Sequence, residues 1–355
     1  MDLAFVSRPF ETMIQIKKEG ILLEKTKLGF ENLGVMNPAV IQVDGIIHLF
    51  FRAVKAGNFS SIGYAKLSSP THVESRQTVP ALFPQFDYES QGMEDPRICI
   101  IEGTYYLSYT AYDGVSALGA LATSTDLITF KKWGIIVPQI TFENFRKLAE
   151  TQGKINDKYI RYNNPFTQSR KANEQAILWD KNVIFFPRKI NQKFHFIHRI
   201  RPDIQLVAVT DLSELTIGFW QNYFLHLTDS ILMTAKYPHE ASYIGGGCPP
   251  IETEDGWLFI YHAVHDTVDG YVYTACAALL DIENPLIEIN RLPLPLFSPE
   301  EPYEKIGYVN NVCFPTGAIV QADTLYIYYG AADERIACAS MSLSELLAQL
   351  KQPNP

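Results

Sequence analysis

The chain of 355 residues is 47% hydrophobic and 19% charged, a composition typical of a folded protein with a sizeable core. Its net charge is −9, and no run of lysines and arginines with interleaved aromatic residues stands out, which argues against a nucleic-acid partner. No apolar run approaches the roughly 18 residues that a membrane span needs, so no membrane contact is expected.

The cysteine pattern and the N-terminus bear on the compartment. The five cysteines are dispersed and form neither a CxxC pair nor a cluster with zinc spacing, which favours buried free thiols in a reducing environment. The first residues lack the basic and apolar segments of a signal peptide, so the sequence predicts a cytoplasmic protein. A periplasmic protein whose leader had been removed would look the same.

In chain order, one unit recurs from about residue 37 onward: a strand, a tight turn, an aromatic strand, a loop and a strand of small residues. The copies begin near residues 37, 95, 182, 248 and 314. Asp-Gly pairs at 44–45 and 255–256 lie between apolar runs, which is a strong hairpin signal.

Five such copies predict an all-β fold, a five-bladed β-propeller that forms a single domain over residues 1–355. A parallel α/β fold would place a periodic helix between the strands, and a β-sandwich would not repeat one hairpin five times. Residues 1–33 precede the first copy, and we expect this extension to pack against the last blade or to close the ring.

Two segments outside the repeat are predicted to be helical. Residues 138–175 separate the second and third copies, and Phe142, Phe145 and Leu148 in this insertion have helical spacing. We expect a short helix and an excursion over one face, the alternative being a disordered surface loop. Residues 342–350 are expected to form a terminal helix with Ser342 as its N-cap.

The motif Met93-Glu94-Asp95-Pro96-Arg97 precedes an apolar strand. A carboxylate held at the entrance of a strand can be aimed into a cavity, where it can donate a proton to a leaving oxygen. The alternative interpretation is a surface salt bridge between Asp95 and Arg97. Arg97 is also a candidate substrate-binding residue.

Further polar residues fall at equivalent places in successive copies. These places are the start of the first strand and the end of the second, which open on the same face of a propeller. A ring of such groups suits a neutral polyhydroxylated ligand and requires neither a metal nor a cofactor. The residues are Asn37, Arg52, Glu94, Asp95, Tyr109, Tyr112, Asp113, Lys181, Asn182, His198, Arg199, His262 and Asp333.

Each of these residues has a simpler interpretation. His262 alone fits a hydrogen-bonded core histidine, Arg52 and Arg199 fit salt bridges at strand ends, and Asn37 fits a turn cap before Pro38.

Seven collinear motifs resemble glycoside hydrolase family 130. They are Met-Glu-Asp-Pro-Arg (93–97), Tyr-Thr-Ala-Tyr-Asp-Gly (109–114), Asn-Val-Ile-Phe-Phe-Pro (182–187), Gly-Gly-Cys-Pro-Pro (246–250), Tyr-His-Ala-Val (261–264), Ala-Leu-Leu-Asp (278–281) and Tyr-Tyr-Gly-Ala-Ala-Asp (328–333). The resemblance implies a five-bladed propeller that acts on β-mannosides, either as a phosphorylase or as a β-1,2-mannosidase. It also implies that Asp95 is the proton donor and that Asn37 and Arg52 contact sugar. Glu94 is expected to hold a substrate hydroxyl or to tune the pKa of Asp95.

The resemblance further implies a phosphate site. Its matching positions are Lys181, Arg199, Tyr243, His262 and Tyr273. The family's phosphorylases usually carry lysine where this chain has Tyr243 and arginine where it has Lys181. Loss of a positive charge weakens an anion pocket, and the nearby Glu240 would repel phosphate.

These departures favour water over phosphate as the nucleophile. We therefore predict an inverting exo-β-1,2-mannosidase with Asp95 as acid and Glu240 as base, although a structural or substrate-binding role for Glu240 fits equally well. One alternative is a β-mannoside phosphorylase that uses inorganic phosphate as co-substrate and releases mannose 1-phosphate. Another is a propeller that binds glycans without catalysis. The oligomeric state is not encoded in any visible pattern.

Overall fold

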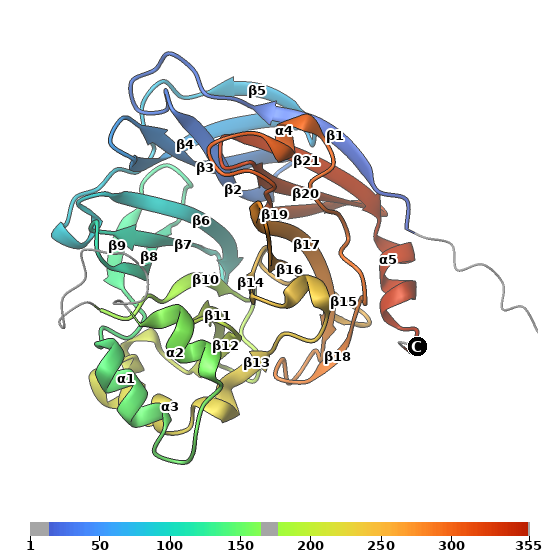
Figure 1. Ribbon diagram of the computed structural model, residues 1–355. Coiled ribbons are helices and arrows are strands. Elements are labelled where there is room, and N and C mark those ends of the chain that lie inside the picture. Colours follow the sequence, from blue (N-terminus) through green and yellow to red (C-terminus); the bar gives the residue numbers. More distant parts are fainter. Residues whose placement is uncertain (1–13, 165–176, 354–355) are drawn as a thin grey trace, which may run out of the picture.

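The protein is described by a computed structural model that covers residues 14–164 and 177–353 (Figure 1). Its strands form antiparallel meanders in which most strands pair with the next along the chain. We number the meanders in chain order. The first consists of β2 (Gly34–Val43), β3 (Ile46–Lys55), β4 (Phe59–Ser69) and β5 (His72–Arg76).

The second and third meanders follow the same order. The second consists of β6 (Gly92–Ile101), β7 (Thr104–Tyr112), β8 (Ala117–Ser124) and β9 (Lys131–Ile135). A single parallel bridge between Ser60 and Gly92 joins it to the first. The third consists of β10 (Lys181–Phe185), β11 (Phe194–Arg199), β12 (Ile204–Val209) and β13 (Ile231–Met233).

The fourth and fifth meanders complete the repeat. The fourth consists of β14 (Tyr243–Gly246), β15 (Ile251–Thr253), β16 (Gly256–Thr267), β17 (Gly270–Leu280) and β18 (Glu288–Arg291). In this meander β14 and β15 both pair with β16. The fifth consists of β19 (Cys313–Gln321), β20 (Thr324–Ala331), β21 (Arg335–Ser342) and, from the start of the described chain, β1 (Lys17–Leu23). The mostly β architecture predicted from the sequence is confirmed.

Tight turns between the first two strands of a meander follow from local sequence. At Asp44-Gly45 and Glu102-Gly103 both residues have positive φ, near 49° and 79°. A two-residue type I′ hairpin requires this conformation, and glycine adopts it without steric cost.

The two ends of the chain meet in the fifth meander, where β1 pairs antiparallel with β21. Lys18 on β1 forms an ion pair with the buried Glu304. The first and last described strands therefore share one sheet, as expected for residues before the first copy.

The first strands of the meanders face the centre of the molecule (Figure 1). Strand β2 contacts both β6 and β19, and β10 contacts both β6 and β14. Apolar clusters fill the spaces between neighbouring sheets; one of them joins Val40 of β2 to Ile319 of β19 and Tyr328 of β20. All five cysteines are buried and unpaired, as predicted.

Helices lie outside the sheets. They are α1 (Phe142–Ala149), α2 (Asp157–Asn163), α3 (Ile217–Leu225), α4 (Pro302–Lys305) and α5 (Leu343–Leu350). The helices predicted around residue 145 and from Ser342 are confirmed, and the side chain of Ser342 caps α5. Helices α2, α3 and α4 were not predicted from the sequence, and residues 165–175 of the insertion lie outside the described part. In the part that is described, no helix has the length and apolar character that crossing a membrane requires.

Candidate active site

The site is built by matching irregularities in three inner strands. Strands β2, β6 and β10 each lose their regular register near their beginning. A residue with left-handed backbone stands within each irregularity: Asn37 (φ 51°), Asp95 (φ 50°) and Asn182 (φ 56°). Asparagine and aspartate adopt this conformation more readily than other residues with a Cβ, and a bulge re-aims a side chain. The repeat therefore selects short polar side chains at these three places.

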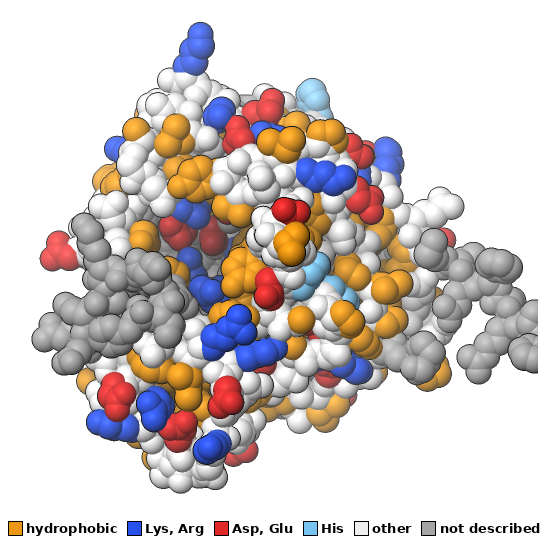
Figure 2. Space-filling view, in the orientation of Figure 1, with side chains coloured by type: hydrophobic (Ala, Val, Ile, Leu, Met, Phe, Trp, Pro, Cys, Tyr) orange, Lys and Arg blue, Asp and Glu red, His pale blue; other side chains and the backbone are white. Residues whose placement is uncertain are grey.

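These residues line a cavity of about 170 Å³ near the axis. Acidic and basic side chains gather in a hollow among the inner strands on the face drawn in Figure 2. The lining residues are Asn37, Arg52, Asp95, Lys181, Asn182, Arg199, Arg201, Tyr243, Tyr273, Val312, Phe314 and Asp333.

Asp95 is held from two sides. Its carboxylate accepts a hydrogen bond from Asn37 Nδ2 at 2.7 Å and lies 3.6 Å from Arg52 Nη1. Burial alone would raise the pKa of Asp95, but the positive charges of Arg52 and Lys181 outweigh it and lower the pKa below its ordinary value. Asp95 is therefore a carboxylate at neutral pH.

Glu94 joins the two cations beside Asp95. Its carboxylate lies 2.7 Å from Arg52 Nη2 and 3.3 Å from Lys181 Nζ. Glu94 itself does not line the cavity, so the structure places it behind the site, where it orients Arg52 and Lys181.

Asp333 is the second carboxylate that lines the cavity. Burial raises the pKa of Asp333, the charge of Arg52 opposes this rise, and the charges of Asp95 and Glu94 add to it, so that the pKa stands at about 6. This carboxyl group consequently titrates close to neutral pH.

Arg97 supports the irregular part of β6 that carries Asp95. It is buried and donates to the backbone oxygens of Asp95 (2.9 Å), Pro96 (3.1 Å) and Gly247. The surface salt bridge considered above is not formed, because Arg97 binds the backbone of Asp95 and not its carboxylate. A direct sugar contact is not supported either, since Arg97 is absent from the cavity lining.

The opposite half of the cavity is rich in arginine and tyrosine. Arg199 Nη1 lies 3.0 Å from Nε2 of His262, whose pKa is held well below its usual range by burial and by the charge of Arg199. The neutral ring therefore accepts a hydrogen bond from the guanidinium. A Cβ at position 245 would lie 2.5 Å from the ring of His262 and 2.7 Å from Arg199 Nη1, so Gly245 is needed for this pair. His262 does not itself line the cavity.

Tyr243 separates the two arginines of this half. Its ring centre lies 5.3 Å from the guanidinium carbon of Arg199 and 4.9 Å from that of Arg201. Its hydroxyl lies 2.6 Å from that of Tyr273. Within residues 14–164 and 177–353, neither guanidinium forms an ion pair with a carboxylate, and the buried Nε of Arg199 has no hydrogen-bond partner. Two cations without an anion indicate an anion-binding site.

Arg201 was not among the predicted site residues, and neither were Val312 and Phe314. The signal for Arg201 is its spacing: side chains two residues apart in an extended chain point to the same face, so Arg199 and Arg201 are expected together. The two apolar residues carried no comparable signal in the sequence.

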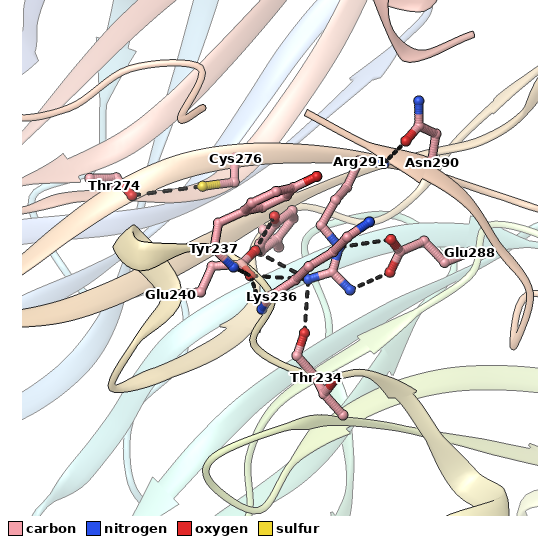
Figure 3. A network of polar contacts seen from close by, with 10 residues as sticks. Thr234, Lys236, Tyr237, Glu240, Thr274, Cys276, Glu288, Asn290 and Arg291 are labelled. Carbon is pink, nitrogen blue, oxygen red and sulfur yellow. Dashed lines mark hydrogen bonds and ion pairs between the residues drawn. The ribbon is translucent and has the colours of Figure 1, made fainter. Parts of the chain in front are cut away.

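The structure does not place Glu240 where a general base would stand. Its carboxylate is fully buried and absent from the cavity lining. It accepts hydrogen bonds from the hydroxyl of Tyr261 (2.6 Å) and the backbone nitrogen of Tyr237 (2.9 Å), and it pairs with Arg291 at 3.2 Å (Figure 3). Both carboxylate oxygens of Glu240 are therefore occupied by hydrogen bonds and an ion pair within the protein.

The same arrangement recurs in two other meanders. Glu89 accepts from the hydroxyl of Tyr109, and Glu304 from that of Tyr329, each at 2.6 Å. Glu89 also accepts from the backbone nitrogen four residues earlier, Glu304 accepts from those three and four residues earlier, and each pairs with a lysine. Glu240 thus belongs to a repeated structural contact.

Tyr112 and Asp113 lie outside the cavity. Asp113 accepts from the backbone nitrogens of Val115 (2.8 Å) and Ser116 (2.6 Å), and the hydroxyl of Tyr112 donates to the oxygen of Gly114 (3.0 Å). Both residues shape the turn between β7 and β8, so the structure does not bring them together with Asp95.

A positioned carboxylate beside an anion site, in a fold of repeated antiparallel sheets, is the arrangement of a carbohydrate-active enzyme. The chain belongs to glycoside hydrolase family 130, whose model, described as beta-1,4-mannooligosaccharide phosphorylase, matches residues 23–352. The resemblance seen in the sequence is thereby confirmed.

Several relatives are similar over nearly their full length. A 1,2-beta-oligomannan phosphorylase of Thermoanaerobacter sp. is 31% identical over 349 residues, covering 94% of this chain and 99% of the relative. A beta-1,2-mannobiose phosphorylase of Listeria innocua is 29% identical, covering 94% and 80%.

Solved structures share the fold. A beta-1,2-mannobiose phosphorylase from Listeria innocua, in complex with beta-1,2-mannobiose, has a TM-score of 0.73 at 24% identity and covers 95% of this chain and 99% of its own. A structure described under family-130 glycoside hydrolases that target beta-1,2 mannosidic linkages in Candida mannan has a TM-score of 0.68 at 22% identity, covering 94% and 95%.

Proposed function

We propose that this protein is an inverting phosphorylase of β-1,2-linked mannosides that releases mannose 1-phosphate. The observation that carries the proposal is the pair Arg199 and Arg201, which lack a carboxylate partner in the described chain and face the same cavity as Asp95. Phosphorylases of β-1,2-mannosides are also among the relatives that match along nearly the whole chain.

This proposal replaces hydrolysis as the main interpretation. Two features favoured water as the nucleophile: Tyr243 in place of lysine, and Glu240 as a candidate base. Arg201 supplies the positive charge that Tyr243 lacks, and Glu240 is enclosed by Tyr261 and Arg291, so both arguments lose their basis.

The reaction follows from the two halves of the cavity. Arg199, Arg201 and Lys181 hold a phosphate dianion, with the hydroxyls of the tyrosine pair as further donors. A phosphate oxygen forms a bond to C1 of the mannosyl unit while the bond from C1 to the β-linked oxygen breaks, giving the α-phosphate. The proton of Asp95 goes to the leaving oxygen, directly or through a sugar hydroxyl.

Phosphate also prepares the acid for this step. The cations that lower the pKa of Asp95 include Lys181, whose charge a bound dianion would balance. Binding of phosphate therefore shifts Asp95 toward its protonated form, so that the acid and the nucleophile become available together.

We further propose that the five meanders are the blades of a five-bladed β-propeller forming one domain over residues 1–355. The repeated strand order and the contact of β19 with β2 support this arrangement.

Incubation of the protein with β-1,2-mannobiose, with and without inorganic phosphate, tests the reaction. We expect mannose 1-phosphate and mannose in equal amounts, only when phosphate is present, and a loss of roughly a thousandfold or more in Asp95→Asn. Release of two mannose molecules per disaccharide without phosphate would instead establish hydrolysis, with Asp333 as the remaining carboxylate that lines the cavity. Binding of the disaccharide without turnover would favour a glycan-binding protein.

A further inference from the structure

Helix α2 of the insertion contacts the loop that follows β11, which begins directly after Arg199 and carries Arg201. The side-chain amide of Asn163, on the last turn of α2, donates to the backbone oxygen of Arg201 at 2.7 Å. The same amide group donates to the oxygen of Tyr159 at 2.8 Å. One side chain therefore ties the end of the helix to the residue that lines the anion half of the cavity.

Gln205 fixes the other side of this loop. It is fully buried, accepts from the backbone nitrogen of Ile200 at 2.7 Å, and donates to the oxygens of Ile200 (3.0 Å) and Asp203 (3.2 Å). Its amide nitrogen also lies 3.0 Å from the hydroxyl of Tyr159 on α2. The loop between β11 and β12 is thus held on both sides by polar contacts that involve α2.

A third contact links α2 to the ring between the arginines. Tyr162 meets Tyr243 edge to face, with ring centres 5.6 Å apart. Tyr243 in turn contacts the guanidinium groups of both Arg199 and Arg201. Helix α2 consequently contacts both the backbone of Arg201 and the ring of Tyr243, which lies against both guanidinium groups.

We propose that Asn163 and Tyr159 are positioning residues for phosphate, which they serve by fixing the orientation of Arg201 and the loop around it. This inference rests on the proposed function and deepens it, since it assigns control of phosphate affinity to the insertion. A planar guanidinium binds phosphate through two parallel hydrogen bonds, so a small rotation of its backbone weakens both. Neither positioning residue lines the cavity, so their effect on the mannosyl group is indirect.

The test is a steady-state comparison of wild type, Asn163→Ala and Tyr159→Phe with β-1,2-mannobiose and phosphate. For Asn163→Ala we expect the KM for phosphate to rise roughly tenfold, as loss of two hydrogen bonds to backbone oxygens predicts, while kcat and the KM for the disaccharide stay within about twofold. Tyr159→Phe keeps the ring and removes the hydroxyl that contacts Gln205 and Asp203 in this loop, so a rise of roughly threefold is expected.

A binding measurement without turnover accompanies the kinetics. Phosphate alone should raise the Tm of the wild-type protein, and Asn163→Ala should need about ten times more phosphate for the same rise. The matched control is Asn144→Ala, the same substitution at an exposed position of α1, a helix that packs on α3. It should leave all constants unchanged.

The outcomes separate this inference from the proposed function. Absence of phosphate-dependent mannose 1-phosphate in the wild type would remove the proposed function itself. An active wild type with an unchanged KM for phosphate in both variants would overturn the inference alone, as would an equal rise in the two KM values. If Asn163→Ala does not fold, Tyr159→Phe decides.

Discussion

At the scale of single residues, the anion half of the cavity depends on two neighbouring arginines. Arg201→Ala removes one of the two guanidinium groups and should raise the KM for phosphate by roughly 10- to 100-fold, since a hydrogen bond to a charged group contributes about 1.5–3 kcal/mol. Arg201→Lys keeps the charge but loses the planar fork, so it should recover only part of the affinity.

Phosphate-dependent initial rates measure both variants. Arg188→Ala is a suitable control, because Arg188 pairs with Glu252 at the surface. An unchanged KM for phosphate in Arg201→Ala would show that Arg199 and Lys181 hold the anion without it.

Asp333 predicts a dependence of stability on pH. Its pKa in the folded protein, about 6, lies above its ordinary value of 3.8, so the folded state binds the proton more tightly than the unfolded chain. The stabilising effect of that proton is fully present below pH 3.8 and is lost as pH rises through 6.

The variant Asp333→Asn removes this titration. The free energy of unfolding of Asp333→Asn minus that of wild type should therefore be larger at pH 8 than at pH 4.5. In other words, the variant gains stability relative to wild type as the pH rises, as measured by urea denaturation at the two pH values. A difference that does not change with pH would contradict the raised pKa.

At the scale of structural elements, the buried glutamate and tyrosine pairs fasten the segment before an inner strand to the second strand of the same sheet. Tyr261→Phe removes the hydroxyl that Glu240 accepts from and should lower the free energy of unfolding by about 1–3 kcal/mol. Because the pair does not line the cavity, kcat should stay within twofold. A large fall in kcat with unchanged stability would restore a chemical role for Glu240.

Much of the fold could be predicted at this scale, and the errors have definite causes. Hairpin turns and polar residues at strand starts are local signals, so Asn37, Asp95 and Asn182 could be found from the sequence. Whether Glu240 is enclosed depends on Arg291, which is 51 positions away in the chain. The sequence did contain one indication that Glu240 is structural. Tyr261 follows Glu240 by 21 residues, and Tyr109 follows Glu89 by 20, so the same pair recurs at nearly the same spacing.

For another reason, helix α2 was not predicted. Residues 157–163 carry too few apolar positions to show a helical period, and the contacts that hold α2 are made with Arg201, Gln205 and Tyr243 from distant parts of the chain. Tertiary contacts of this kind stabilise short helices that propensity alone does not.

At the scale of the whole molecule, closure of the fifth sheet depends on Lys18. Its side chain is 13% exposed and pairs with Glu304, which is fully buried. Lys18→Ala leaves that carboxylate without its cation, which should cost about 3 kcal/mol and lower the Tm measured by calorimetry. Lys17→Ala, next to it and 74% exposed, should leave the Tm nearly unchanged, because an exposed ion pair is screened by water. Equal effects of the two substitutions would mean that the buried pair does not secure the closure.

Pairing of β1 with β21 also has a consequence for biosynthesis. Strand β1 leaves the ribosome early, but its partner emerges only after more than three hundred further residues have been translated. Until β21 has been made, β1 has no partner strand. A prematurely terminated polypeptide would therefore keep an unpaired strand edge that other chains can join. We therefore expect incomplete translation products of this protein to depend on chaperones and to be degraded quickly.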